Sequence, residues 1–205
     1  MSPAIEIDQV YPGLFVWQNY DPMVKADLFS TAFEAALGLF LIDPIPLAAE
    51  AFAELTNIGR LAGVIVTNAN HHRDSVRLAD RFSLALFAHS EASLPLEVRQ
   101  LQTLEEGTLL AEELRVIAIE GAVPGEIALH YPKDRGTMIV GDALINFAPY
   151  GFTFLPAKYC SNPKRMRHSL RHLLDFEFER MVFAHGTPLL KSARRQLEQL
   201  LSSYG

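Results

Sequence analysis

The order of strand-like and helix-like segments limits what this chain can fold into more than any other feature of its sequence. Short runs rich in aromatic and aliphatic residues fill residues 1–45, with Pro, Gly and Asp between them, which is typical of a meandering sheet. A second group of apolar runs occupies residues 114–145, and segments of helical pattern follow each group. Two strand-rich stretches, each followed by helices, predict an α/β fold with two packed sheets between helices.

Local signals give the positions of individual elements. Residues 46–59 begin with proline and end with glycine, which indicates a helix, and "DSVRLADRF" is predicted to form a second one. A basic helix is expected over 162–179 and an amphipathic one over 188–204. Further strands are expected at 61–68, 84–89 and 180–186, and "EIALHYP" and "GTMIVGDALI" form a predicted strand pair around a turn at 133–136.

Composition excludes several classes of protein. No repeat, low-complexity tract or Gly/Ser-rich linker divides the chain, so we expect one domain over residues 1–205. The single cysteine, Cys160, excludes an internal disulfide, and no segment has the pattern of a signal peptide or a membrane span. These features predict a cytoplasmic protein that is not bound to membranes.

Charge and apolar content bear on the partners of the chain. Its net charge of −6 argues against nucleic acid as a partner. Residues 154–174 carry no acid but several Lys and Arg, which is either a site for an anionic small molecule or a solvated helix face. The apolar opening strands would permit a homodimer.

Side chains that can bind metal follow three of the predicted strands. His71, His72 and Asp74 follow "VIVTN", Asp142 ends "MIVGD", and His185 follows "MVFA". Imidazole nitrogens and carboxylate oxygens are ligands for zinc, iron and manganese, and three protein ligands leave one position for water. A water bound there loses its proton more easily and can attack an ester, amide or phosphoester.

The order of these pieces resembles the metallo-beta-lactamase superfamily, from about Val10 to Leu201. The resemblance depends on "YPGLFVW", "LFLIDP", "VIVTN", "VPGEIAL", the "GD" at 141–142 and the "HG" at 185–186. It implies a four-layer αββα sandwich of two mixed sheets flanked by helices, with the site at one edge between the sheets.

The metal loop departs from the pattern of that family. The family reads Thr-His-x-His-x-Asp-His, whereas an ungapped count from Thr67 puts Asn68 and Asn70 at the two histidines of the first metal. Ala122 stands where the family has a third histidine, just before a turn. The resemblance therefore implies that the first metal position has lost its ligands.

The second metal position keeps more of its ligands. The same count puts His72 at its aspartate, while Asp142 and His185 match its bridging carboxylate and last histidine. We predict that these three hold one divalent metal ion, zinc or else iron or manganese, and that His72 and Asp142 are catalytic. A shift of register in the loop would bring His71 or Asp74 into the ligand set instead.

The neighbouring residues have alternative interpretations. Arg73 replaces a neutral ligand of the family with a permanent charge, which would either neutralise Asp142 in a metal-free site or bind a carboxylate or phosphate of the substrate. Asp43, at the end of "LFLID", would orient a ligand or the loop backbone, or else cap a turn before Pro44. Asp74 would cap the following helix.

Two functions remain open on this sequence. The first is a metal-dependent hydrolase that uses at most one metal-bound water on an unknown ester- or phosphoester-type small molecule. The second is a binding or regulatory module that keeps the fold without metal. In that case Asp142 would stabilise a turn and His185 would be a buried structural histidine. A nucleic-acid-processing enzyme is disfavoured by the acidic total charge.

Overall fold

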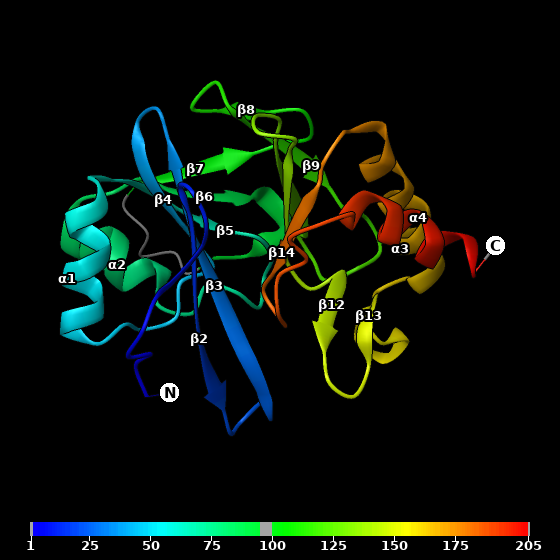
Figure 1. Cartoon of the computed structure of the whole chain (residues 1–205), viewed down its shortest axis with the longest axis horizontal. Helices are drawn as coiled ribbons and strands as arrows, with labels where there is room; N and C mark the ends of the chain where they lie inside the picture. The colour runs from blue at the N-terminus through cyan, green and yellow to red at the C-terminus, as the bar shows by residue number, and fades with distance from the viewer. Residues whose placement is uncertain (1, 95–99, 205) are drawn as a thin grey trace.

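One sheet contains the first half of the chain. The computed structural model describes residues 2–94 and 100–204, and its larger sheet has seven strands in chain order (Figure 1). Strands β1 to β4 are antiparallel neighbours, whereas β4 to β7 run parallel. The strands are β1 (Asp8–Tyr11), β2 (Leu14–Asp21), β3 (Ala26–Ala35), β4 (Gly38–Ile42), β5 (Leu61–Val66), β6 (Leu86–His89) and β7 (Leu101–Leu104).

The second sheet has five strands in the order β14-β11-β10-β9-β8. Strands β11 and β14 are parallel and the other pairs antiparallel, so this sheet is also mixed. Its strands are β8 (Leu109–Leu110), β9 (Leu114–Ala118), β10 (Ile127–Tyr131), β11 (Thr137–Val140) and β14 (Arg180–Phe183), and a separate ribbon joins β12 (Leu144–Phe147) to β13 (Gly151–Phe154).

Helices cover the outer face of each sheet. Helices α1 (Ala49–Ile58) and α2 (Ser75–Phe82) lie on the larger sheet, and α3 (Pro163–Leu170) and α4 (Ala193–Ser202) lie on the smaller one (Figure 1). The residues that the structure describes also form three short 3-10 segments: η1 (Ser90–Ala92), η2 (Ala157–Tyr159) and η3 (Arg171–Asp175). This arrangement confirms the predicted four-layer αββα sandwich.

Continuous apolar strands are explained by burial on both faces of each sheet. In β5, Ile65 faces the core between the sheets, whereas Val64 and Val66 face the core under α1 and α2. In β11, Ile139 faces the middle core and Met138 the core under α3 and α4. Since successive strand residues point to opposite faces, a strand between two cores is apolar throughout.

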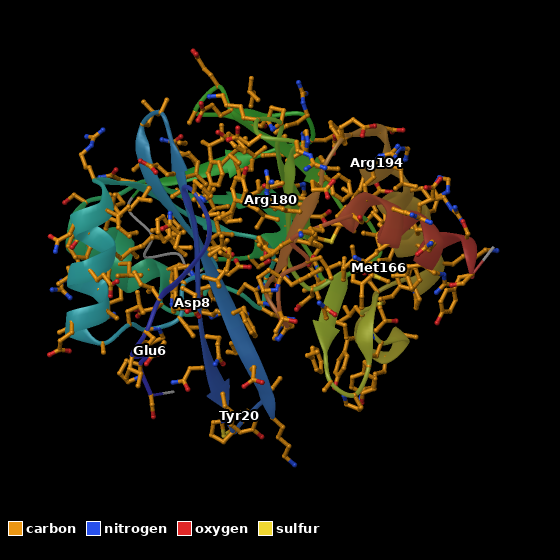
Figure 2. All side chains as sticks on the ribbon, viewed as in Figure 1. Glu6, Asp8, Tyr20, Met166, Arg180 and Arg194 are labelled. Atoms are coloured by element: carbon orange, nitrogen blue, oxygen red, sulfur yellow. The ribbon has the colours of Figure 1, made fainter. Side chains whose placement is uncertain are left out.

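Each outer core is closed by apolar side chains of its helices. Leu55 of α1 and Leu78 of α2 pack with Trp17 of β2. Met166 of α3, labelled in Figure 2, and Leu197 of α4 are buried in the core on the other side of the molecule.

Besides shifts of a few residues at other ends, three differences between the predicted and the observed elements stand out. Helix α3 ends at Leu170 and continues as η3 to Asp175, short of residue 179. Helix α4 begins at Ala193 and not at residue 188, because Leu189 forms an antiparallel bridge with Met181. The segment predicted as one strand over 136–145 divides into β11 and β12, which belong to different sheets. The predicted turn at 133–136 is confirmed, with Gly136 N donating to Lys133 O at 2.9 Å.

The two sheets place four strand ends at one edge of the sandwich. Strands β4 and β5 run parallel in one sheet, and β11 and β14 run parallel in the other, so the carboxyl ends within each pair lie side by side. The sheets also join there, because Phe29 N donates to Ala184 O at 2.9 Å and Ile127 N to Thr67 O at 2.8 Å. Within residues 2–94 and 100–204, the helices are all too short or too polar to span a membrane.

Candidate metal centre

Three metal-competent side chains meet at this edge. Asp142 Oδ1 lies 3.1 Å from His71 Nε2 and 3.1 Å from His185 Nε2. The three atoms all lie within 4.8 Å of one another, and no other group of three such residues is found in the described part of the chain. His71 and Asp142 are buried, and His185 is partly exposed, so the cluster opens to solvent at His185.

Strand ends and tight loops bring these side chains together. His71 lies in a turn after β5, in which its backbone N–H donates to Asn68 O at 3.1 Å. Asp142 follows β11, and Gly141 before it leaves no room for a side chain, since a Cβ there would lie 2.5 Å from Thr67 Oγ1. His185 lies two residues after the end of β14. The candidate centre is therefore built from both sheets.

The Nδ1 atoms of both histidines are already engaged on the far side of each ring. Nδ1 of His71 lies 2.8 Å from Asp43 Oδ2 and 3.0 Å from Thr67 Oγ1. The carboxylate of Asp43 accepts in turn from the backbone N–H of Thr67 at 2.8 Å and from the hydroxyl of Thr67, and these two bonds fix its position. Nδ1 of His185 lies 3.3 Å from the carbonyl oxygen of Asp27. Both rings therefore present Nε2 to Asp142, the arrangement that orients histidine ligands in metal sites.

Charge is strongly coupled within the cluster. Burial disfavours the charged form of His71, but the carboxylates of Asp142 and Asp43 outweigh burial and the repulsion from Arg73, and raise the pKa of His71 to about 9. The pKa of Asp142 is held well below its usual range, because His71 and His185 outweigh its burial. Burial likewise opposes the charge of Asp43, but the nearby His71 and Arg73 leave its pKa lowered. Without metal, the cluster is a protonated imidazole between two carboxylates.

The donor set fits a single divalent ion. Two imidazole nitrogens and one carboxylate oxygen match catalytic zinc sites, which use three protein ligands and keep one position open. Donor atoms about 2.1 Å from a tetrahedral zinc ion are separated by roughly 3.4 Å. The two separations of 3.1 Å from Asp142 are close to that value, and the one to His71 also suits a hydrogen bond from a protonated imidazole.

The structure brings together His71, Asp142 and His185, but not His72 and Asp74. His72 is exposed, and its Nδ1 lies 3.3 Å from Ala69 O. Adjacent residues of an irregular segment point in different directions, and the turn that ends at His71 directs that side chain inward. The ungapped count of the sequence analysis therefore assigned the ligand role to His72, whereas His71 is the histidine that points into the cluster. The carboxylate of Asp74 instead binds the guanidinium of Arg77, and it forms no cap hydrogen bond to α2.

Arg73 lies beside the cluster but does not bind Asp142 directly. Its Nη1 donates to the carbonyl oxygens of Phe29 at 2.6 Å and Asp43 at 2.9 Å, and its Nη2 to Ala184 O at 3.5 Å. No ion pair joins its guanidinium to a described carboxylate. No direct pair neutralises Asp142, although its charge and that of Arg73 attract each other at longer range. Two carbonyl oxygens use both N–H groups of Nη1, whereas Nη2 meets a single carbonyl at 3.5 Å, so the binding of a substrate anion by Arg73 stays a prediction. Asp43, in contrast, orients both a ring and the loop backbone, as the sequence predicted.

The residues that the ungapped count assigns to the first metal position do not form a cluster, and one of them is hydrogen-bonded to Glu126. Asn68 is buried, and its Nδ2 donates to Glu126 Oε2 at 2.7 Å, while Glu126 Oε1 accepts from Ala143 N at 2.9 Å. Asn70 is exposed and Ala122 is buried. Sequence reasoning missed Glu126. Its one signal was a carboxylate at the start of the apolar run "EIALHY".

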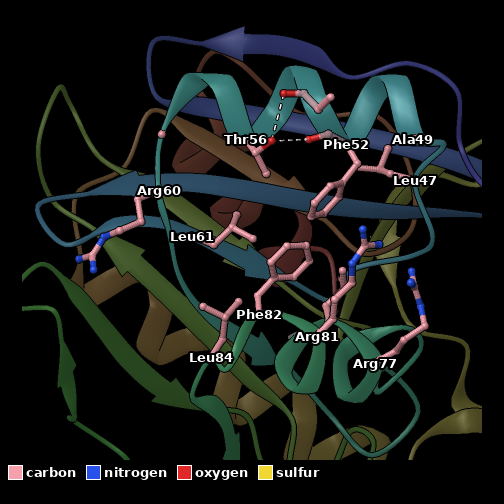
Figure 3. A pocket seen from close by; sticks show the side chains of 13 residues that line it. Leu47, Ala49, Phe52, Thr56, Arg60, Leu61, Arg77, Arg81, Phe82 and Leu84 are labelled. Atoms are coloured by element: carbon pink, nitrogen blue, oxygen red, sulfur yellow. Dashed lines mark hydrogen bonds between the residues drawn. The ribbon is translucent and has the colours of Figure 1, made fainter.

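A groove elsewhere on the molecule is not part of this centre. It lies between α1 and α2 on the outer side of the larger sheet and has a volume of about 670 Å³ (Figure 3). Its walls include Phe52 and Phe82, whose rings stack at 5.2 Å, and the guanidinium of Arg81 lies 5.0 Å from the Phe82 ring. None of the three clustered side chains lines the groove, so its shape carries no information about the centre.

Comparisons with known proteins identify the fold. A family model described as the Metallo-beta-lactamase superfamily matches residues 8–204. No curated protein matches the chain. Among solved structures, the DIM-1 metallo-beta-lactamase has a TM-score of 0.75 at 14% identity, with 99% of each chain covered.

Two further solved structures show the same likeness. A beta-lactamase domain protein from Burkholderia ambifaria has a TM-score of 0.73 at 18% identity, covering 100% of this chain and 78% of its own. The metallo-beta-lactamase FIM-1 from Pseudomonas aeruginosa, in its mono-zinc form, has a TM-score of 0.73 at 11% identity, covering 99% of this chain and 96% of its own. At these identities the likeness shows the fold alone.

Proposed function

The chain belongs to the metallo-beta-lactamase superfamily, and we propose that it is a metal-dependent hydrolase that holds one divalent ion between His71, Asp142 and His185. The observation that carries the proposal is the convergence of two Nε2 atoms and one carboxylate oxygen within 4.8 Å at the edge between the sheets. Zinc, iron and manganese all accept this donor set. Superfamily membership supports hydrolysis as the reaction class.

A divalent ion bound there would supply Lewis acidity and an activated water for attack on an ester or phosphoester. The side chains of the protein prepare the site for it. Asp142 is ionised at neutral pH because its pKa is held well below its usual range, so it is ready to attract a cation. His71 must release the proton on its Nε2 before that nitrogen can act as a ligand. The proton on Nδ1 of His71 stays in place, because Nδ1 is hydrogen-bonded to the carboxylate of Asp43.

One ion, and not two, is the number that these residues support. The buried amide of Asn68 is engaged by Glu126, and Ala122 offers no ligand atom. The FIM-1 enzyme in its mono-zinc form shows that a protein of this fold can hold a single zinc ion. The single cysteine, Cys160, supports the further proposal that the protein works in the cytoplasm, where thiols stay reduced.

The first experiment is elemental analysis for zinc, iron and manganese on protein purified without a metal-binding tag. We expect about one metal ion per chain in the wild type and in His72→Ala, and a loss of that metal in His185→Ala. His72→Ala is the matched control because it removes an imidazole that is next to the centre in sequence but outside it in space.

The activity itself is tested after the metal content is known. Metal-loaded wild type and His185→Ala would be assayed on a panel of aryl esters, thioesters and phosphodiesters, and the wild type alone should turn over one of these classes. Absence of bound metal after incubation with excess zinc or manganese at neutral pH would contradict the hydrolase. It would favour the metal-free binding module, in which the hydrogen-bonded network of His71 is the final state of the site.

A further inference from the structure

Arg73 joins three backbone segments, one within a strand and two just after strand ends, that no other described side chain joins. Its guanidinium donates to Phe29 O within β3, to Asp43 O after β4 and to Ala184 O after β14. The first two acceptors belong to the larger sheet and the third follows the smaller sheet. The guanidinium therefore bridges the two sheets at the edge where the candidate centre lies.

Two of these three carbonyls belong to, or adjoin, residues that shape the centre. Asp43, whose carbonyl accepts from Arg73, holds Nδ1 of His71 with its own carboxylate. Ala184 directly precedes His185 in the chain. A shift of either carbonyl would therefore move one of the two imidazoles relative to Asp142.

The backbone of this loop indicates that the contacts of Arg73 are needed to hold it. Arg73 has a φ of 34° and Asp43 a φ of 48°, both in the left-handed region that non-glycine residues rarely adopt. Such conformations persist only where the surrounding structure compensates for their cost. The guanidinium contacts contribute to this compensation, together with the hydrogen bonds from Ser30 Oγ to Asp43 O at 2.7 Å and from Phe29 N to Ala184 O at 2.9 Å.

Only an arginine can make this set of contacts. The guanidinium is planar and carries its donors in a fixed fork, so it reaches several acceptors at once, whereas a lysine places three donors on a single nitrogen atom.

We propose that Arg73 is a positioning residue that holds His71 and His185 in their ligand geometry before any metal binds. It acts through Asp43 on His71 and through Ala184 on His185. The description of these histidines as metal ligands rests on the proposed function, but the positioning itself does not.

The test compares Arg73→Lys with Arg180→Lys in metal-free protein. Arg180 is the matched control: it is also buried, and its Nε donates to Thr137 at 3.0 Å (Figure 2). It begins β14, so it lies at the opposite end of that strand from His185. Both variants should lose stability, but only Arg73→Lys should disturb the positions of His71 and His185.

The main readout is the imidazole ¹H–¹⁵N NMR spectrum in the presence of a chelator. In Arg73→Lys we expect the signals of His71 and His185 to move towards those of an exposed histidine such as His72. The signal of His130 should stay in place. This histidine lies in β10, outside the centre, and its Nε2 is 2.9 Å from Glu177 O. If Arg73→Lys does not fold, Arg73→Ala with added millimolar guanidinium replaces it, and rescue of both signals is expected.

A second readout is metal affinity by competition with a chromophoric chelator. Residues that orient ligands typically contribute 10- to 100-fold to metal affinity, so Arg73→Lys should bind zinc about tenfold more weakly or worse, and Arg180→Lys about as tightly as wild type. Equal disturbance of His71 and His185 in both variants, or none in Arg73→Lys, would overturn the proposal. Absence of metal in the wild type would refute the proposed function only, because the NMR comparison needs no metal.

Discussion

The buried imidazole of His71 should make the metal-free protein less stable as the pH rises above neutral. Its pKa in the folded protein is about 9, against 6.5 for an ordinary histidine, because Asp142 and Asp43 outweigh the cost of burial. A group with a raised pKa stabilises the folded state fully below its unfolded pKa, and that stabilisation is lost as the pH rises through the folded value. For His71 the window extends from pH 6.5 to about 9.

The magnitude follows from the difference between the two pKa values. At 1.36 kcal/mol per pKa unit, the difference between 6.5 and about 9 corresponds to about 3 kcal/mol of unfolding free energy. The physical cause is that a neutral imidazole can donate only one hydrogen bond. Above pH 9, both buried carboxylates therefore lose the positive charge of His71, and one of them also loses its hydrogen-bond donor.

The assay is urea unfolding in the presence of a chelator, at several pH values between 6.5 and 9. His71 alone should account for a loss of about 3 kcal/mol in wild type across this range, and His71→Gln should lack that part of the decline, because it has no proton to release at this position. Glu126 contributes with the same sign, since its burial and the nearby Asp142 raise its pKa to about 8. A Glu126→Gln variant separates the two, because it should keep the part of the decline that is due to His71. A wild-type stability that stays level or increases over this range would refute the reasoning, as would a full decline in His71→Gln.

Three further outcomes are expected. Gly186→Ala should lower the unfolding free energy by about 3 kcal/mol, because Gly186 has a φ of 113° and a Cβ there would lie 2.0 Å from Asn146 O; chemical denaturation measures it. Asp43→Asn should cost about 3 kcal/mol without metal, since it breaks the buried pair with His71, and a titration followed by NMR should show the pKa of His71 lowered. Zinc at about 100 times its Kd should stabilise wild type by roughly 3 kcal/mol in thermal unfolding but not His185→Ala. That increment should shrink as the pH falls below 9, because the metal must displace the proton of His71.

Much of the architecture could be predicted because it depends on local patterns. The β10–β11 pair could be found from two apolar runs around a Gly-containing turn, and its register was then limited by the turn itself. The four helices were recognised from their amphipathic spacing and end signals. The predicted helix ends were less accurate where tertiary contacts determine the boundary. Leu189 is an example, because it pairs with Met181 and α4 begins only after it.

The candidate site was only partly accessible from the sequence. Asp142 and His185 each lie two residues after a buried strand, so their position at a sheet edge could be inferred from chain order alone. The choice between His71 and His72 could not, because the loop after Val66 has no periodic pattern that fixes which side chain points inward. Similarly, nothing local marks Glu126 as the partner of Asn68, since 58 positions separate them in the chain.

By itself, the sequence determined the two-sheet sandwich and the strand ends that carry metal-competent side chains. These depend on residue type and on order along the chain. Only the tertiary structure decided that His71 is the inward histidine and that Arg73 binds carbonyls and not a carboxylate. The reason is that Asp43, Thr67 and Ala184 come from three different strand ends, and their hydrogen bonds exist only once both sheets have packed together.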